Sequence, residues 1–489
     1  PIRDYCVAKI SEHISNPKSR AVVLALVLGV KDELDNELVQ SFSATGAMHV
    51  LAVSGLHVGI IYGILFWLLK RFNLHKRKYR WWVVIISVLV LWAYALLTGL
   101  SPSVLRAVTM FSLMAVGRAL FRKGNIYNTL SLSALALLLF NPYLIMSVGF
   151  QLSFLAVFGI VYLHPKIYGV WQADHWLLDK IWSITCVSIA AQIATGPLSL
   201  LYFHQFPTYF MVSNLFIIPA AFAILIGGLV LLVVSFVPIL AGLAGTILGV
   251  LVWAVNWTVE SVSRFPNSTI DGIYLSILDT WLIYAVLFGI TLYFVLKKRS
   301  YLTLSLICSL VFAVSQVSHF SLYSKTIELS VLNASNHSVI DFRYGHQGRL
   351  LANEGFLMSS ESQQFSLHGK RLLAGVKQEI KEDQLRLASV KLPMGELFVI
   401  DGKSVLWLNE RIQTYDNPHK EFAPDYLIIS NNSISNQEEL KPYLQSKTII
   451  LDKSNAFYTQ RSIQESAKEN GLNIHQVSTN GYFSSLWRK

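Results

Sequence analysis

The chain has 489 residues, of which 53% are hydrophobic and only 14% charged, which excludes an ordinary soluble enzyme and is typical of a membrane protein. Its net charge of +11 is uneven, because residues 1–320 hold 21 basic and 11 acidic side chains whereas residues 321–489 hold 19 and 18. The three cysteines, at positions 6, 186 and 308, are too far apart to indicate a disulfide framework or a zinc site.

Residues 1–46 predict a short lead-in and a helix on the membrane surface. SRAVVLALVLGV (19–30) supplies an apolar face, and KDELDNELVQ (31–40) continues it with acidic, solvated positions. Twelve apolar-rich residues are too few to cross a bilayer, so we expect an interfacial amphipathic helix. No cleavable signal peptide is recognisable, and a first residue other than Met leaves room for a longer natural N-terminus.

From residue 47 to about residue 320, apolar runs follow one another closely. Ten of them are candidates for membrane-spanning helices, and the fourth is short enough to be re-entrant or paired with the fifth. They cover residues 47–69, 81–98, 104–121, 127–140, 143–163, 181–203, 208–235, 238–262, 277–296 and 301–320. With ten spans, the basic loops, such as 70–80 and 297–299, all fall on one side. By the positive-inside rule that side is cytoplasmic, which places the first 46 residues and the C-terminal tail outside the cytoplasm.

The first of these runs, Gly46–Lys70, is unusually polar for a membrane helix. On a continuous helix, glycines recur at every fourth position and form a smooth stripe suited to close packing, at Gly55, Gly59 and Gly63. Polar side chains fall on roughly the opposite side, namely His49, Ser54 and His57. Polar groups in hydrocarbon must be satisfied inside the protein, so something other than lipid should face them.

The sixth run carries a polar stripe along one helix face. Its members fall within about 60° of one another, and they are Ser188, Gln192, Thr195 and Ser199. Such a stripe either bonds to neighbouring helices or lines a wet cavity. Further polar residues lie in other spans, namely Gln151, Ser153, Asn214, Asn256 and Glu260. Together they favour a hydrated interior shared by several helices.

Five strings in order along the spans resemble the ComEC competence-protein family. They are HVLAVSGLHVG (49–59), GLSPSVLRA (99–107), NPYLIMSVGFQLSFLAVFGI (141–160), GPLSLLYFHQFP (196–207), and Asn214 followed by Pro219. The resemblance implies a multi-pass channel in the cytoplasmic membrane that translocates single-stranded DNA during natural transformation. It also implies a cytoplasmic helicase-like ATPase motor, an extracytoplasmic DNA receptor and a separate nuclease as partners. The chain itself has no Walker A motif.

Polar spacing and resemblance together select the candidate residues of a DNA path. These are His49, Ser54, Gly55, His57, Gly59, Arg106, Gln151, Ser188, Gln192, Thr195 and Asn214. The two histidines could offer neutral hydrogen-bonding groups to phosphates or bases, or could bond to neighbouring helices. Gln151 is more typical of a packing hydrogen bond.

Arg106 is expected about one turn inside the outer end of its span. Ser101 can cap a helix that Pro102 begins, which fixes that position. An arginine there could attract phosphates at a channel mouth. It could equally snorkel to lipid headgroups or pair with Glu260.

The tail beyond residue 320 predicts a soluble α/β or α+β domain. Strand-like runs such as DYLIISN (425–431) and KTIILD (447–452) alternate with helix-like stretches. Its opening strands resemble the metallo-β-lactamase-like domain that ends many family members. The HxHxDH ligand motif of that domain is absent, and Asn431 and Asn432 stand where a histidine-bearing loop would fall. Because asparagine is a poor zinc or manganese ligand, we expect a degenerate, non-catalytic domain without metal or cofactor.

The resulting prediction has three parts: an extracytoplasmic lead-in (1–46), a transmembrane channel domain (47–320) and a soluble extracytoplasmic α/β domain (321–489). The main alternative is a proton-coupled secondary transporter for a small solute, in which His49, His57 and Glu260 relay protons. Such a carrier should show internal repeats, and none is convincing in the sequence. A membrane enzyme with a hydrolytic tail is a further alternative, which the missing ligand motif disfavours.

Overall fold

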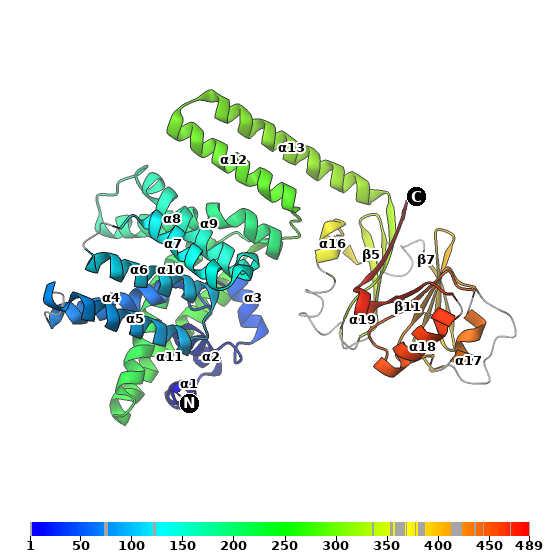
Figure 1. The fold of residues 1–489 in the computed structure, drawn as a ribbon, viewed down its shortest axis with the longest axis horizontal. Coiled ribbons are helices and arrows are strands. Elements are labelled where there is room, and N and C mark those ends of the chain that lie inside the picture. The colour runs from blue at the N-terminus through cyan, green and yellow to red at the C-terminus, as the bar shows by residue number, and fades with distance from the viewer. Residues whose placement is uncertain are drawn as a thin grey trace. The chain divides into compact units, whose positions relative to one another are not determined.

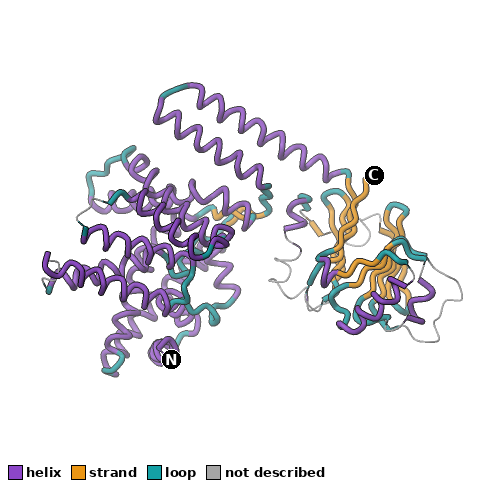
Figure 2. Tube along the Cα trace, in the orientation of Figure 1, coloured by secondary structure: helices purple, strands orange, loops and turns teal. Residues whose placement is uncertain are grey.

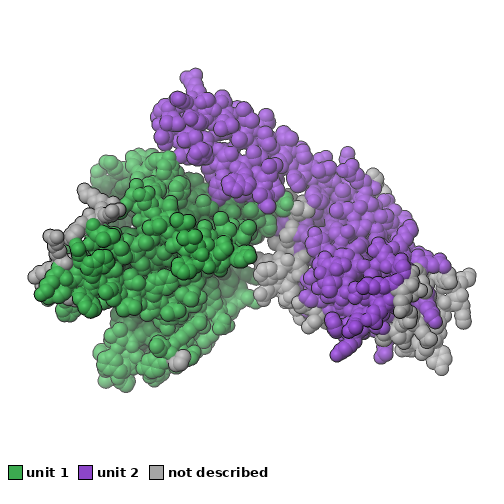
Figure 3. Space-filling model, viewed as in Figure 1, with its two compact units in different colours: residues 1–275 green, residues 276–489 purple. Residues whose placement is uncertain are grey.

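The computed structural model describes residues 2–488 apart from 73–76, 121–123, 335–336, 353–355, 357–366, 368, 377, 380–386, 412–422, 435–436, 444 and 470. The chain forms two compact units, residues 1–275 and 276–489, which are coloured separately in Figure 3.

The first unit is helical, as Figure 1 shows. Its longer helices are α1 (Ile2–His13), α2 (Pro17–Leu28), α3 (Asn36–Ala44), α4 (Gly55–Arg71), α5 (Arg80–Leu97), α6 (Pro102–Ala119), α7 (Ile126–Phe140), α8 (Val148–Tyr168), α9 (Trp176–Phe203), α10 (Phe210–Val234) and α11 (Pro238–Ser263). Two short 3₁₀ turns, η1 (Arg77–Tyr79) and η2 (Pro142–Met146), precede α5 and α8. A small antiparallel ribbon pairs β1 (Gln205–Pro207) with β2 (Thr269–Asp271).

Seven of the described helices are long and apolar enough to cross a membrane: α5, α8, α9, α10, α11, and in the second unit α12 (Ile277–Leu296) and α13 (Arg299–Ser324). The ten predicted spans all contain a helix, but only these seven meet that standard. Helices α4 and α7 are shorter, with 17 and 15 residues, and α6 has 18 residues but contains two arginines, which lower its mean hydropathy. The prediction of a multi-pass helical membrane protein is therefore supported, whereas the count of ten spans is not.

Helix α2 corrects the prediction of an amphipathic helix at the membrane surface. Every residue from Ala21 to Leu28 is at most 2% exposed, so the helix is buried around its whole circumference. It packs against α1, α10 and α11, and Gly228 on α10 leaves just enough room for Val27, which a Cβ at Gly228 would approach to 2.5 Å. A helix of twelve residues extends about 18 Å. The N-terminal segment is therefore a short core helix rather than a surface element.

The second unit begins with the α12–α13 hairpin and continues into a sheet-containing domain. Its strands are β3 (Thr326–Val331), β4 (Val339–Tyr344), β5 (Gln347–Ala352), β6 (Gln378–Glu379), β7 (Leu387–Leu392), β8 (Gly395–Ile400), β9 (Lys403–Leu408), β10 (Tyr426–Ile429), β11 (Thr448–Leu451), β12 (Ile474–Gln476) and β13 (Phe483–Arg488). Its shorter helices are α16 (Gly369–Leu373), α17 (Gln437–Leu440), η6 (Lys441–Tyr443), α18 (Phe457–Glu469) and α19 (Val477–Asn480). The predicted strands at 425–431 and 447–452 are present as β10 and β11.

Two sheets pack face to face in this domain, as the strands in Figure 2 show. One sheet has the order β12-β11-β10-β9-β8-β7, in which β9 to β12 are parallel; the other has the order β13-β3-β4-β5-β6. The apolar layer between them includes Phe342 and Phe398, whose ring centroids lie 5.1 Å apart. Residues of α17 and α18 pack in the apolar cluster on the outer face of the first sheet. The predicted α/β or α+β tail is therefore present as a sheet-containing domain with its own apolar clusters.

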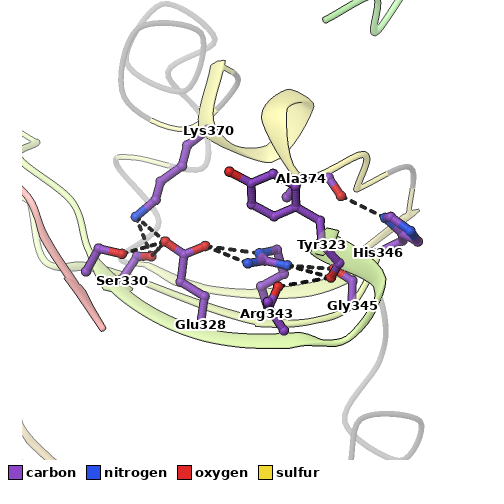
Figure 4. A network of polar contacts seen from close by, with 10 residues as sticks. Tyr323, Glu328, Ser330, Arg343, Gly345, His346, Lys370 and Ala374 are labelled. Atoms are coloured by element: carbon purple, nitrogen blue, oxygen red, sulfur yellow. Dashed lines mark hydrogen bonds and ion pairs between the residues drawn. The ribbon is translucent and has the colours of Figure 1, made fainter. Parts of the chain in front are cut away.

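The outer face of the second sheet carries a buried charge network, drawn in Figure 4. Strand side chains alternate between the two faces, so Ile327 and Leu329 enter the apolar layer while Glu328 points outward. The Glu328 carboxylate accepts hydrogen bonds from Arg343 Nε at 3.1 Å and Nη2 at 2.9 Å, and it lies 2.8 Å from Lys370 Nζ. Arg343 also donates to the carbonyl oxygen of Tyr323 at the end of α13, which ties that helix to the domain.

Removing the charge of Glu328 should destabilise this domain strongly. Glu328→Gln leaves the guanidinium of Arg343, a residue only 2% exposed, without its carboxylate, and breaking a buried pair in this way costs about 3–5 kcal/mol. We expect the urea midpoint of the domain to fall, as measured by pulse proteolysis of the full-length protein. The matched control, Glu465→Gln, removes an exposed pair with Arg461 and should leave the midpoint unchanged. Equal midpoints for wild type and Glu328→Gln would contradict the role of the network.

The same network predicts an acid-dependent loss of stability. Burial raises the pKa of Glu328, but hydrogen bonds and charges from Lys370, Ser484 and Arg343 outweigh it and hold the pKa below its usual value. A lowered folded-state pKa adds stability that is present above the unfolded value, about 4.3, and is lost as the pH falls through the folded value. The wild-type domain should therefore lose this stabilisation on acidification below about pH 4.3. Glu328→Gln should not show that component in the same proteolysis series.

Candidate functional site

The helix of the predicted first span begins later than expected. Residues 47–54 are not helical, and α4 begins at Gly55 with Ser54 at its N-cap position. His49 and Ser54 therefore do not share a helix face with His57, and that part of the prediction is wrong. The exposed His49 instead places Nδ1 3.1 Å from the carbonyl oxygen of Gly46. The periodicity suggested one helix, but the serine cap interrupts it.

His57 is held by the residue that caps its own helix. Its Nδ1 accepts the Ser54 N–H at 3.0 Å and lies 2.8 Å from the Ser54 hydroxyl. A neutral imidazole that accepts at Nδ1 carries its proton on Nε2. His57 is 2% exposed, and Nε2 has no hydrogen-bond partner among the described residues. The ring therefore presents a buried N–H donor that a polar ligand or water could accept.

The predicted glycine stripe of α4 faces α6 over two of its three positions. A Cβ on Gly55 would lie 2.5 Å from Arg106 Nη2, and one on Gly59 would lie 3.2 Å from the ring of Phe111. Nothing lies within 4 Å of the corresponding position at Gly63. Only a residue without a side chain at position 55 lets the guanidinium approach the first turn of α4 this closely.

Arg106 is buried at the junction of three helices. As predicted, α6 begins at Pro102, so Arg106 lies one turn inside it, although the side chain of Ser101 makes no capping bond. Arg106 Nε donates to Ser153 Oγ on α8 at 2.6 Å, and the guanidinium carbon lies 5.9 Å from the centre of the Phe154 ring. The residue is 6% exposed, which is not the geometry of a snorkelling side chain.

The alternative partner proposed for Arg106 is engaged elsewhere. Glu260 Oε1 on α11 accepts from Lys18 Nζ at 3.1 Å. No acidic side chain among the described residues forms an ion pair with Arg106. Within the described part of the chain its charge is thus compensated by neutral groups, which is unusual for a buried guanidinium.

Other candidates take part in local packing. Gln151 Nε2 donates to the carbonyl oxygen of Ile145 at 2.7 Å, and Gln151 Oε1 accepts from Tyr202 on α9 at 3.2 Å. Thr195 Oγ1 donates at 2.8 Å to the carbonyl oxygen of Ala191, four residues earlier, and α9 continues unbroken through Pro197. These bonds fit the packing interpretation of Gln151 and satisfy Thr195 within its own helix.

Several buried polar atoms of the first unit have no protein partner among the described residues. Some of them lie on α4, α9, α10 and α11 in turn: His57 Nε2, Ser188 Oγ, Asn214 Oδ1 and the amide of Asn256, of which neither atom has a partner among those residues. Gln192 is partly buried on α9, one turn after Ser188. No hydrogen bond or ion pair between described residues links Ser188, Gln192 or Asn214 to Arg106. Because buried polar groups are normally hydrogen-bonded, such a set indicates an interior that accommodates water or a polar ligand.

In the tail, the loops that follow β10 and β11 bond to each other. Asn432 N–H donates to Asn455 Oδ1 at 2.9 Å, and Asn432 Oδ1 accepts the Ala456 N–H at 2.7 Å. Asp452 is 0% exposed and accepts from Ser430 Oγ at 2.7 Å. Burial raises the pKa of Asp452 despite its serine hydrogen bonds, which disfavours the charged form that a metal would need.

Two of the described tail histidines bond to backbone carbonyl groups elsewhere in the domain. His346 Nδ1 lies 2.8 Å from the carbonyl oxygen of Ala374, and His475 Nε2 lies 3.1 Å from that of Gly481. His368 and His419 lie outside the described residues. Within the described part of the chain, no group of three His, Cys, Asp or Glu side chains could hold a metal ion.

Two residues of these sites, Ser153 beside Arg106 and Asp452 in the tail, are not among the candidates that the sequence predicts. Ser153, the partner of Arg106, stood out only as a polar residue in FQLSF, two positions after Gln151. Asp452 ends the strand-like run KTIILD, and a carboxylate at the carboxyl end of a predicted parallel strand was the available signal.

Comparisons with known proteins agree with this architecture. The family described as Competence protein matches residues 26–300, and the ComEC C-terminal domain family matches residues 329–487. ComE operon protein 3 of Bacillus subtilis is 32% identical over 222 residues, which cover 44% of this chain and 27% of that protein. An uncharacterised protein of Aquifex aeolicus is 36% identical over 161 residues, covering 33% of this chain and 37% of the relative. Competence protein ComA of Neisseria gonorrhoeae is 32% identical over 145 residues, covering 28% and 20%.

The matched segments thus span well under half the length of these curated relatives. No solved structure matches the chain significantly. The two family matches follow one another along most of the sequence, the first over the helical bundle and the second over the sheet-containing domain. The chain therefore belongs to the ComEC family of competence proteins.

Proposed function

We propose that the chain forms a channel through which single-stranded DNA crosses the cytoplasmic membrane during DNA uptake. The observation that carries the proposal is the set of buried polar atoms without protein partners inside the helices of the competence-family region. A polyanion crossing a membrane needs hydrogen-bond donors in place of its hydration. The N–H of His57 Nε2 and the guanidinium of Arg106 are donors of this kind.

The partners and the orientation are part of the proposal. The chain has no phosphate-binding loop of the Walker A type, so the energy would come from a cytoplasmic helicase-like ATPase or from a gradient. An extracytoplasmic receptor would deliver DNA, and a separate nuclease would remove one strand. The basic loops support a cytoplasmic side opposite to the tail, which places the C-terminal domain outside the cytoplasm.

We infer that the tail is a non-catalytic relative of metallo-β-lactamase-like domains. Its two packed sheets with outer helices support that likeness, as does the edge formed by the carboxyl ends of parallel β9 to β12, where such folds place ligands. At that edge Asn432, Asp452 and Asn455 are engaged with neighbouring residues of the same two loops. With a net charge of only +1, residues 321–489 have little electrostatic attraction for DNA, so the proposed role is docking of partner proteins or guidance of DNA.

The proton-coupled transporter has less support from the geometry. A relay through His49, His57 and Glu260 requires these groups to communicate, yet Glu260 is paired with Lys18 and His57 bonds to Ser54. Loss of solute-driven proton uptake together with normal DNA uptake in a deletion strain would favour the transporter.

Deleting the gene should abolish entry of DNA into the cytoplasm. In a competent host, fluorescent DNA should still reach the cell surface but should stop outside the cytoplasmic membrane, because its conduit is missing. Microscopy of nuclease-protected DNA measures this, and a plasmid-borne copy of the gene should restore entry. Entry of DNA into the cytoplasm at the normal frequency in the deletion strain would contradict the channel proposal.

The purified full-length protein should not cut DNA. Incubation of labelled single- or double-stranded DNA with Mn²⁺ or Zn²⁺ should leave it intact on a denaturing gel, because Asn431 and Asn432 are poor ligands and Asp452 is buried. The metal-free sample is the control. Metal-dependent cleavage that Asp452→Asn abolishes would overturn the non-catalytic assignment.

A further inference from the structure

We propose that Arg106 and the first turn of α4 form a binding site for one phosphodiester group of the DNA. This inference rests on the proposed function, because that function supplies DNA as the ligand. It goes further in assigning a phosphate subsite to particular atoms: the guanidinium of Arg106 and the backbone N–H of Gly55 at the start of α4.

The positive charge of Arg106 lies at the start of α4. Arg106 Nη2 lies 2.5 Å from where a Cβ of Gly55 would be, so the guanidinium touches the first residue of α4. The N-terminus of a helix carries a partial positive charge and unsatisfied N–H donors. The guanidinium of Arg106 and the positive end of the α4 dipole therefore meet at Gly55. Their repulsion is relieved when an anion binds beside them.

Helices α6 and α8 begin close to each other, and Arg106 joins them. The first turn of α8 abuts the start of α6, since a Cβ on Gly149 would lie 3.7 Å from Pro102 Cγ. Arg106 also bonds to Ser153 in the second turn of α8. The amino ends of α6 and α8 thus meet each other, while the guanidinium contacts the start of α4, whose dipole favours negative charge there.

The described residues supply no negative charge that would balance the charge of Arg106. Among the described residues no carboxylate pairs with Arg106, and Glu260, the acidic residue expected to do so, pairs with Lys18. Arg106 thus has neutral acceptors in Ser153 and Met110 but no anionic one among the described residues, and the oxygens of a phosphodiester would accept from its guanidinium.

Access to the site comes from the same turn. Ser54 and Gly55 are partly exposed, and Leu56 is 49% exposed, while the guanidinium behind them is buried. A phosphate could therefore reach the Gly55 N–H from outside and contact Nη2 behind it. Glycine at position 55 is needed for this approach, because any Cβ would displace the guanidinium from the helix end.

The test measures the salt dependence of DNA binding. Full-length protein in phosphatidylcholine nanodiscs binds fluorescein-labelled oligothymidylate, and the slope of log K against log[KCl] counts the phosphates contacted, about 0.7 per phosphate for a single strand. We expect Arg106→Gln to reduce the slope by about 0.7 and the affinity by about tenfold, and Arg106→Lys to retain the slope. Arg118→Gln, on the same helix but against the rings of Tyr62 and Phe66, is the matched control and should keep the wild-type slope.

A glycine pair tests the geometry independently of the charge. Gly55→Ala should displace the guanidinium and weaken binding as Arg106→Gln does, whereas Gly63→Ala, with open space around it, should bind like wild type. Elution of each variant as a single peak at the wild-type volume in size-exclusion chromatography verifies folding.

The outcomes separate the two proposals. Normal binding with an unchanged slope in Arg106→Gln would overturn the subsite and leave the channel proposal standing. No binding of oligothymidylate by the wild type would overturn both. Nanodiscs with added phosphatidylglycerol complete the test: a wild-type slope that falls to that of Arg106→Gln when this lipid is added would assign the site to lipid headgroups and overturn the DNA assignment.

Discussion

The constraint around which the first unit is organised is a buried guanidinium, that of Arg106, for which the described residues provide no carboxylate partner. Moving a charge out of water is costly, and in proteins it is normally compensated by an ion pair or by several hydrogen bonds. Arg106 has one strong bond, to Ser153, and otherwise touches Met110, an aromatic ring and the start of α4. The site is therefore suited to an anion that comes and goes, since a permanent internal carboxylate would compete with a passing phosphate.

The packing of the unit supplies the rigidity that such a site requires. Helix α2 is enclosed by α1, α10 and α11, and its buried residues belong to the same apolar cluster as residues of α10 and α11. A separate cluster joins α4, α5 and α6 and includes Val58, Leu91 and Ala107. Arg106 follows Val104 and precedes Ala107 and Val108 of this second cluster, so its backbone is fixed while its guanidinium reaches α4 and α8. Buried polar atoms that bond to no other described residue lie on the helices around these apolar clusters, which fits a bundle with a hydrated interior.

The sequence was informative where a pattern is local and much less so where contacts are distant. Apolar runs placed helices at all ten predicted spans, and alternating patterns placed β10 and β11, because both signals depend on neighbouring residues. The twelve-residue α2 was misassigned since a fully buried short helix and half of an amphipathic one share the same apolar residues. The start of α4 was missed because the cap by Ser54 is completed by His57, whereas the usual third residue of a capping box is Glu or Gln. The environment of Arg106 depends on Ser153, 47 residues away, and no local pattern predicts that contact.

The central claim is that DNA passes through the first unit beside Arg106, and site-specific photo-crosslinking tests it most directly. A photoreactive phenylalanine analogue would replace Phe154, whose ring lies 5.9 Å from the Arg106 guanidinium carbon, or Phe216, which is 58% exposed on α10. Irradiation during uptake of labelled DNA should produce a protein–DNA adduct at position 154 and none at position 216. Adducts at position 216 with none at position 154, in cells that import DNA normally, would contradict the account.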